Sequence, residues 1–213
     1  MSIRTEVIPI KTHIITKKDD IIEVIRKYVG PQIEKGDIIT IAETVLAISQ
    51  GRYVRPDDVK LSLTARIISR FISQDGSLSS PYALQVVMNE EGKTKVTMAF
   101  IIGTFCQKVF RMKGVFYRLA GYQAAMIDDI TGTMPPFDKY IVLGPSKPEK
   151  VVIDIKKKLG AEAAIIDAND LGRTKIVAAT KGVDLNLLDE IFRKNPAGNA
   201  DQQTPLVLIK VKQ

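Results

Sequence analysis

The chain has 213 residues, 45% of them hydrophobic and 26% charged, a composition that excludes a wholly disordered or collagen-like protein. It has one histidine, His13, and one cysteine, Cys106, which excludes a Cys/His zinc site or an intramolecular disulfide built from its own residues. The chain has 31 Lys and Arg and 24 Asp and Glu, so its net charge is +7, which favours anionic partners. Any chemistry must therefore use carboxylates, hydroxyls, amides and cationic side chains, and we expect a hard, oxygen-binding cation to assist it.

The amino-terminal residues and the hydropathy pattern favour a cytoplasmic protein. Residues 1–10 alternate charged with apolar side chains, which is unlike a signal peptide. The longest apolar stretch, residues 96–106, is far shorter than the roughly 20 residues that span a bilayer. We therefore expect no membrane span.

Two strands separated by a helix are predicted in the first 52 residues. Residues 3–10 have the pattern of a strand, and apolar side chains recur at helical spacing between residues 21 and 29. The sequence Thr-Lys-Lys-Asp that begins at Thr16 resembles a capping box, which places the start of this helix at Thr16. Residues 38–42 are rich in β-branched side chains and predict a buried strand that leads into Glu43 and Thr44.

Residues 57–120 differ in character from the rest of the single domain that we predict over residues 1–213. Helical spacing appears at residues 65–72 and 82–88, with a polar break between them. Nine Lys and Arg residues against five Asp and Glu give this segment more than half of the net charge. We predict a helical, basic insert or lobe.

Aromatic and basic side chains alternate over residues 105–122. Such a mixture is compatible with an RNA-binding face, or with a surface for a membrane or an acidic ligand. The interpretation we favour is a helical face that packs inside while its charges are solvated. Nucleic acid is accordingly not an expected partner.

Strands and helices alternate in the last third of the chain, which predicts a mixed α/β (α+β) fold of mixed sheets with flanking helices. Asp184 is expected to cap the last helix. The predicted strands cover residues 140–144, 163–167, 175–179 and 206–211, and the predicted helices follow residues 146 and 184.

Two acidic residues each end an apolar run, Asp128 and Asp167. Carboxylates at strand ends, beside hydroxyl and amide groups, are suited to Mg²⁺ or Mn²⁺ that bridges phosphate oxygens. The alternative is that each Asp caps a turn or helix, as Asp often does.

Two further segments are candidates for holding a ligand. Backbone amides and a hydroxyl at Glu43-Thr44, with Arg52 nearby in the sequence, are suited to phosphate, whereas the plainer interpretation is a turn with a surface Arg. Residues 196–201 form a small, polar loop that either closes over a ligand or simply connects two elements.

The order of these motifs resembles the γ-glutamyl ligases that extend the tail of the deazaflavin coenzyme F420. The likeness covers residues 3–52 and 122–211 but not the segment between them. The motifs are Gly36-Asp37-Ile38-Ile39, Glu43-Thr44, Gly51-Arg52, Ile127-Asp128, Asp167-Ala168-Asn169 and the loop around Gly198.

This resemblance implies a γ-glutamyl-ligase-like fold in an intertwined homodimer, with GTP as co-substrate and Mg²⁺ or Mn²⁺ as cofactor. It implies an acid–amino-acid ligase in which GTP phosphorylates the carboxylate of a small anionic substrate, and the amine of glutamate attacks the acyl phosphate. Because phosphoryl transfer depends on positioning and charge neutralisation, a chain with one histidine can carry it out.

The resemblance also implies roles for individual residues. Asp128 and Asp167 would hold the metal. The implied nucleotide-binding residues are Thr12, His13, Ile14, Ile15, Glu43, Thr44, Arg52, Thr131, Asn169, Gly198 and Asn199.

Three positions depart from the family pattern. Ile48 stands in place of a nucleotide-contacting Lys, Ala168 in place of a hydroxyl residue that binds a second metal, and Thr131 in place of an Asn. These losses weaken charge neutralisation, so the alternative function is a non-catalytic nucleotide- and metal-binding or regulatory relative.

Overall fold

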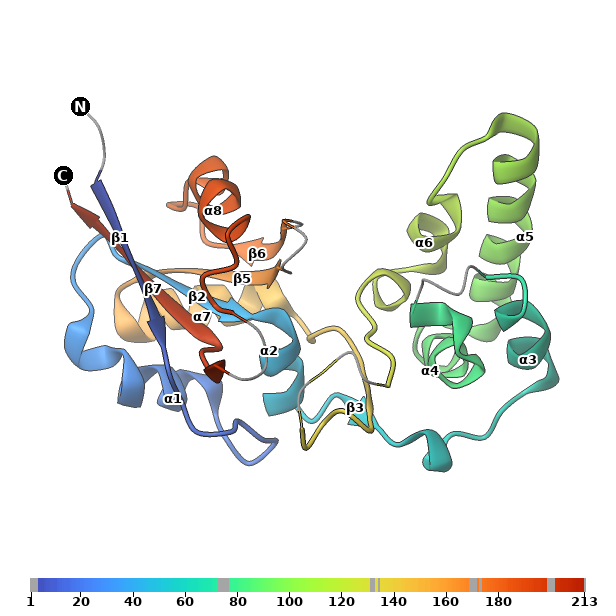
Figure 1. Ribbon diagram of the computed structural model, residues 1–213, viewed down its shortest axis with the longest axis horizontal. Helices are drawn as coiled ribbons and strands as arrows, with labels where there is room; N and C mark the ends of the chain where they lie inside the picture. The colour runs from blue at the N-terminus through green and yellow to red at the C-terminus, as the bar shows by residue number, and fades with distance from the viewer. Residues whose placement is uncertain are drawn as a thin grey trace. The chain divides into compact units, whose positions relative to one another are not determined.

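The protein is seen in a computed structural model that describes residues 4–72, 77–130, 133, 135–168, 172, 174–198 and 202–212. Its chain forms two compact units (Figure 1). Residues 1–51 and 145–213 make up the first unit, and residues 52–144 make up the second. The segment predicted as a basic lobe, residues 57–120, lies within the second unit.

The first unit is a mixed sheet with helices, which confirms the predicted mixed α/β class. In the part of this unit that the structure describes, five strands pair in the order β1-β7-β2-β5-β6, and only β2 and β5 run parallel. Its elements are β1 (Arg4–Ile10), α1 (Ile21–Tyr28), β2 (Ile38–Ala42), α2 (Glu43–Ser49), α7 (Pro148–Leu159), β5 (Glu162–Ala168), β6 (Thr174–Ala179), α8 (Leu185–Phe192) and β7 (Leu206–Lys212).

The inner strands of this sheet are buried on both faces. Alternate side chains of a strand point to opposite faces, and in β2 Ile39 and Ile41 enter one core while Ile38 enters another. Strand β7 alternates in the same way, with Leu206 and Leu208 in the first core. Strands buried on both faces read as continuous apolar runs, which is why residues 38–42 are so rich in isoleucine.

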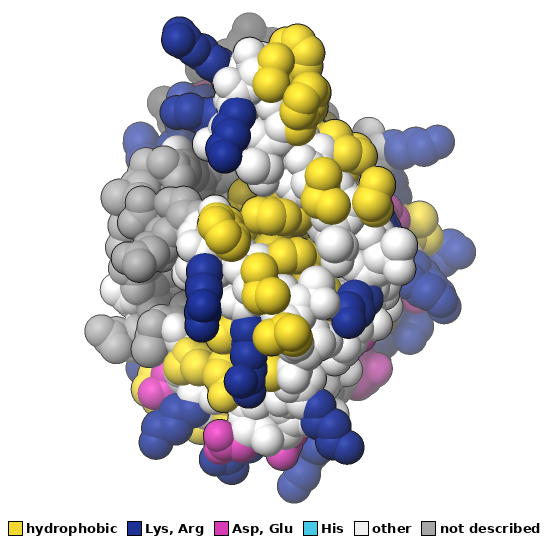
Figure 2. All heavy atoms as spheres, turned by 90° about the vertical axis from the view of Figure 1, so that its right-hand side faces the viewer, with side chains coloured by type: hydrophobic (Ala, Val, Ile, Leu, Met, Phe, Trp, Pro, Cys, Tyr) yellow, Lys and Arg dark blue, Asp and Glu magenta, His cyan; other side chains and the backbone are white. Residues whose placement is uncertain are grey.

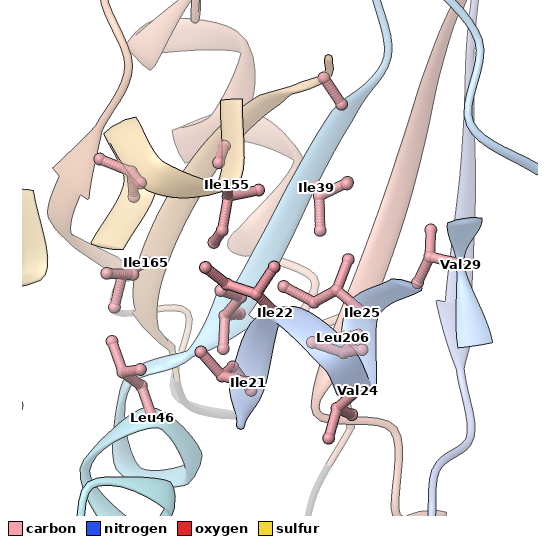
Figure 3. Packing of buried hydrophobic residues seen from close by; sticks show 14 of the residues in the cluster. Ile21, Ile22, Val24, Ile25, Val29, Ile39, Leu46, Ile155, Ile165 and Leu206 are labelled. Atoms are coloured by element: carbon pink, nitrogen blue, oxygen red, sulfur yellow. The ribbon is translucent and has the colours of Figure 1, made fainter. Parts of the chain in front are cut away.

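Helices α1 and α7 cover one face of the sheet. Ile22 and Ile25 of α1 pack with Ile155 of α7 against the strand residues Ile39 and Ile165 (Figure 3). The other face is covered by α8, whose Leu188 and Phe192 pack against neighbouring strand residues. The side chains that face the sheet are thereby removed from water, and such packing is the main source of stability for a helix.

The predicted start of α1 at Thr16 is wrong, because Asp20 caps this helix. The amides of Ile22 and Glu23 donate to Asp20 Oδ1 over 2.8 and 3.2 Å. The carboxylate of Asp19 instead closes a local turn, accepting from the Thr16 amide at 2.8 Å and from its hydroxyl at 2.9 Å. Prediction of the last helix start is confirmed, since the amides of Asn186 and Leu187 donate to the Asp184 side chain.

Helices dominate the second unit. Its elements are β3 (Tyr53–Val54), α3 (Leu63–Ser69), α4 (Pro81–Glu91), α5 (Lys93–Phe110), α6 (Val115–Ala120) and β4 (Ile141–Val142), with short 3₁₀ turns at Pro56–Asp58, Ser77–Ser79 and Gln123–Ala125. Strands β3 and β4 pair antiparallel. Its core centres on α4, where Leu84 and Val87 are fully buried. Within the described residues, no helix combines the length and the apolar composition needed to cross a membrane.

Helix α5 packs closely on α6 at Gly103. A Cβ atom added at Gly103 would lie 2.8 Å from both the Cβ and the backbone nitrogen of Phe116. The half-buried rings of Phe116 and Tyr117 join the core of this unit, as the favoured interpretation of residues 105–122 requires. That interpretation is wrong for Phe105 and Phe110, which are 58% and 62% exposed, because α6 covers one side of α5 only.

We expect Gly103→Ala to lower the free energy of unfolding by about 1–3 kcal/mol, because the new methyl group overlaps the Phe116 backbone. Elsewhere in a helix, replacement of Gly by Ala stabilises by up to about 1 kcal/mol, so the sign of the change is diagnostic. Urea denaturation followed by circular dichroism measures it. The control is Gly30→Ala, whose Cβ would only touch the Arg26 side chain at 3.7 Å, and equal effects of the two changes would contradict the close approach.

The turn before α1 gives a pH-dependent contribution to stability. A hydrogen bond to His13 and the amide of Thr16 hold the pKa of Asp19 below its ordinary value of 3.8. Its carboxylate therefore stabilises the fold fully above that value, and the contribution is lost as the pH falls through the lower pKa of the folded state.

We expect Asp19→Asn to destabilise the protein at about pH 7 by roughly 0.5–1 kcal/mol. The difference from the wild type should be smaller at a pH below 3.8, where the unfolded state takes up protons before the folded state does. Urea midpoints at both pH values test this, with Asp20→Asn as the control because Asn caps helices as well as Asp does. A difference that stays constant with pH would refute the role of the Asp19 charge.

Candidate functional site

A small pocket lies in the first unit where the parallel strands β2 and β5 end. Its volume is about 90 Å³. Pockets for whole small molecules usually measure about 300–1,000 Å³, so this one has room for a phosphate-sized group rather than a nucleotide. It is lined by Thr40, Ala42, Glu43, Thr44, Ile166, Asp167, Ala168, Phe192, Asn195, Ala197, Gly198, Pro205 and Val207.

Strand register explains why distant segments meet here. Ala42, the last residue of β2, pairs with Ile166 of β5, so Glu43 and Asp167 follow at the same edge of the sheet. The backbone amide of Ala42 donates to Pro205 at 2.9 Å, which fixes the start of β7 at the same edge. Ligands of α/β sheets commonly bind outside the carboxyl ends of parallel strands.

Glu43 supplies a buried carboxylate to the pocket. It is the first residue of α2 and is only 4% exposed. The Thr44 hydroxyl donates to Glu43 Oε2 over 3.2 Å, which orients the carboxylate. A carboxylate with so little solvent contact retains a strong attraction for any cation that enters.

Asp167 supplies a second carboxylate, which keeps contact with solvent. Desolvation by the surrounding protein atoms nevertheless raises the pKa of Asp167 above its usual range, and the Lys175 ammonium opposes the rise. Lys175 stands directly opposite Asp167 in the antiparallel pair of β5 and β6. The pocket thus joins two carboxylates and a hydroxyl, the oxygen donors that Mg²⁺ or Mn²⁺ prefers.

The loop after α8 forms another wall of the pocket. Asn195 has a positive φ of 42° and its side-chain amide donates to the Gly198 carbonyl at 3.3 Å. The Thr204 hydroxyl donates to the Ala197 carbonyl from the far side of the loop. Of residues 196–201, Ala197 and Gly198 line the pocket, whereas residues 199–201 lie outside the described part of the chain.

Seven lining residues were not predicted from the sequence, and Thr40, Phe192 and Asn195 are three of them. Thr40 and Phe192 belong to apolar runs of β2 and α8 and carry no local signal of a site. Asn195 directly precedes Pro196, and its tolerance of positive φ is a turn signal that could have identified it.

Asp128 lies in the second unit, whereas Asp167 lies in the first. The backbone of Asp128 pairs with Val142 through hydrogen bonds of 2.8 and 2.9 Å. Burial raises the pKa of the adjacent Asp129, against the effect of the Ile130 amide and the Ser80 hydroxyl. Among the described residues, no three His, Cys, Asp or Glu side chains gather as a metal-binding group, so the predicted Asp128–Asp167 metal pair stays a prediction.

The predicted nucleotide-binding residues 12–15 connect β1 to α1. Thr12 is 5% exposed and its hydroxyl donates to the His13 carbonyl at 2.8 Å. The His13 ring lies between Tyr28 and Asp19, 2.9 Å from the Tyr28 hydroxyl and 3.0 Å from Asp19 Oδ1. Ile15 is buried in the sheet core, whereas Ile14 is 43% exposed.

Arg52 belongs to the second unit and is engaged there. Its Nε donates to the Gly144 carbonyl at 2.7 Å, and its Nη2 pairs with Glu90 at 2.9 Å. A phosphate would have to compete with both contacts. The predicted site residues Thr131, Asn169 and Asn199 lie outside the described part of the chain.

The two described departures from the family pattern lie in different environments. Ile48 is 3% exposed on α2 and packs in the interior, so it offers nothing to a ligand. Ala168 ends β5 and lines the pocket without a hydroxyl. The pocket therefore depends on fewer charged and polar groups than the family pattern supplies.

Comparison with known proteins agrees with the motif order. A sequence model of the family described as F420-0:Gamma-glutamyl ligase matches residues 9–167, which include Glu43, Thr44 and Asp167. The match also runs through residues 57–120, the segment without a counterpart in the motif comparison. No curated protein matches the chain. Because the family match covers most of the 213 residues, this chain belongs to the F420-0:gamma-glutamyl ligase family.

Proposed function

We propose that this protein is a GTP- and divalent-metal-dependent ligase that joins glutamate to the carboxylate of a small acceptor by a γ-glutamyl-type amide bond. One observation supports it most. Glu43, Thr44, Asp167 and the Gly198 loop meet in one pocket at the ends of paired parallel strands. Family membership points to the same class of reaction.

The proposed reaction has two steps. An acceptor carboxylate oxygen attacks the γ-phosphorus of GTP, the bond to the bridging oxygen breaks, and GDP leaves. The glutamate amine then attacks the acyl carbon, inorganic phosphate leaves with the oxygen that carried it, and the nitrogen loses a proton. Both steps require anionic groups to approach each other, so they depend on charge neutralisation and positioning.

Asp167 and Glu43 are the residues that would hold Mg²⁺ or Mn²⁺ in the pocket. A bound cation neutralises phosphate charge. The Thr44 hydroxyl, which donates to Glu43, would keep that carboxylate oriented toward the cation, and the Gly198 loop would exclude water from the pocket. The small volume suits the phosphate end of the nucleotide, while residues 12–15 remain the predicted border of the guanine.

The acceptor is expected to be a small anion, as the net charge of +7 favours. A homodimer is also expected from the family resemblance. Light scattering coupled to size exclusion measures the oligomeric state directly.

We expect Asp167→Asn to reduce GTP- and Mn²⁺-dependent ligation by about a hundredfold or more, because it removes a carboxylate of the pocket at nearly constant size. Glutamate-dependent release of phosphate, measured with candidate carboxylate acceptors, follows the reaction. Asp154→Asn on α7 is the matched control, because Asp154 lies outside the pocket lining. Full activity of Asp167→Asn would refute the proposed site.

The second candidate is a relative that binds nucleotide and metal without turnover. The buried position of Ile48 and the missing hydroxyl at Ala168 favour it, since both remove groups that would neutralise phosphate. A cation held by fewer ligands can still bind nucleotide and yet fail to stabilise the charge of the transition state.

A thermal-shift panel of GTP, ATP and other nucleotides, each with and without Mn²⁺, tests whether the protein binds a nucleotide, as both the ligase and the non-catalytic relative require. A ligand at a hundred times its dissociation constant adds about 2.7 kcal/mol of stability, or about 5–10 °C for a chain of this size. We expect GTP with Mn²⁺ to give this shift and Asp167→Asn to abolish it. A shift without glutamate-dependent phosphate release would select the second candidate, and no shift with any nucleotide would exclude both.

A further inference from the structure

The second unit exposes a large apolar surface on α3 and α5. Figure 2 shows hydrophobic side chains in a band along this side of the molecule, with Lys and Arg beside them. We call this surface the α3/α5 face, and its main residues are Ile67, Phe71, Ile101, Phe105, Val109 and Phe110. Phe71 is 73% exposed and Phe105 58%. Soluble monomers rarely expose large contiguous apolar patches, and those with polar residues around them mark interaction sites for proteins, membranes or ligands.

Helix α5 is apolar on two opposite sides. Val96, Ala99 and Gly103 lie on one side and are buried in the unit. Ile102, Phe105 and Val109, at spacings of three and four residues, form the exposed stripe on the other side. A helix that is hydrophobic all round is normally covered all round, so the outer stripe requires a partner that this unit does not supply.

The same helices carry positive charge and no negative charge. Residues 59–72 and 92–127 contain nine Lys and Arg and no Asp or Glu. All nine are exposed, including Arg66, Arg70 and Lys108. Within the described residues, Lys95 is the only one of the nine in an ion pair, with Glu91. The partner of this face must therefore accept apolar side chains and unpaired cations together.

A second copy and a nucleic acid each satisfy one of these requirements only. A symmetric dimer through this face would bring the unpaired cations of both copies into one interface, with no acidic side chains from these helices to balance them. A nucleic acid would neutralise the charge and stack bases on the exposed phenylalanine rings, but it would leave the aliphatic side chains of Ile67, Ile101 and Val109 in contact with water.

We propose that the α3/α5 face docks the protein on the surface of a bilayer that contains anionic lipids. The apolar side chains enter the boundary between headgroups and acyl chains, and the flanking Lys and Arg meet the lipid phosphates. Binding is peripheral, in the plane of the interface, and needs no membrane-spanning helix. This proposal is independent of the ligase reaction.

Sedimentation of the full chain with lipid vesicles tests the proposal. We expect binding to phosphatidylcholine vesicles containing about 30% phosphatidylglycerol, weaker binding in high salt, and little binding to phosphatidylcholine alone. The double variant Phe71→Asp/Phe105→Asp should weaken binding about tenfold or more. Its control, Ile153→Asp/Leu185→Asp, changes side chains that are similarly exposed on α7 and α8 and should bind like the wild type.

A charge-reversal pair tests the electrostatic part. Arg66→Glu/Arg70→Glu should lose most binding to the anionic vesicles, whereas Lys157→Glu/Lys158→Glu at the end of α7 makes the same change in charge and should lose little. Equal losses in the two pairs would show a response to net charge alone and would overturn the assignment to this face.

A single tryptophan tests the same face with a variant that keeps the surface apolar and is therefore less disruptive than an Asp substitution. The chain has no Trp, so Phe105→Trp and Ile153→Trp each introduce a single fluorophore. We expect a blue shift on addition of anionic vesicles for Phe105→Trp only. The proposal is overturned if the wild type does not bind anionic vesicles or if both tryptophan reporters respond alike. It is also overturned if the only effect of Phe71→Asp/Phe105→Asp is to convert a dimer into a monomer or to abolish RNA binding.

Discussion

The parallel pairing of β2 with β5 is the constraint on which the first unit depends. It aligns the carboxyl ends of two strands that lie more than 100 residues apart in the chain, so Glu43 and Asp167 leave the sheet at one edge. Parallel strands need cover on both faces, which α1 and α7 supply on one side and α8 on the other. The loop that follows α8 then borders the same edge. The pocket is thus a consequence of how the core is buried.

Near the pocket, apolar side chains stand at two positions where the family pattern has a charged or polar residue. Helix α2 begins with the buried Glu43, and Ile48, further along the same helix, is buried in the interior. Burial of an isoleucine contributes about 1.5–3 kcal/mol to stability, whereas a cation at that position would have to remain in contact with solvent or ligand. Because Ile48 is buried and Ala168 is apolar, the charged side chains that line the pocket are those of Glu43 and Asp167.

The second unit depends on close packing between helices rather than on strand pairing. Gly103 allows α5 to approach α6 so closely that a methyl group would not fit, and this one contact line leaves the other side of α5 uncovered. Because that side is apolar, and because its cations have no acidic neighbours in the same helices, the exposure is unlike that of an ordinary solvated surface. The ligase chemistry proposed for the first unit makes no use of this face.

By itself, the sequence determined the mixed α/β class, the strands around residues 38–42 and 206–211 and the cap at Asp184, because periodicity and capping are local properties. It also pointed to Glu43, Thr44 and Asp167, because polar residues that follow an apolar run can be recognised in the sequence, and to Gly198 through a small, polar loop and the family resemblance. Only the tertiary structure decided that these four residues share a pocket with Thr40, Phe192 and Asn195, because strand pairing and register bring them together. It likewise decided that Asp20 rather than Thr16 caps α1 and that Phe105 faces outward, because burial depends on which neighbours a helix finds.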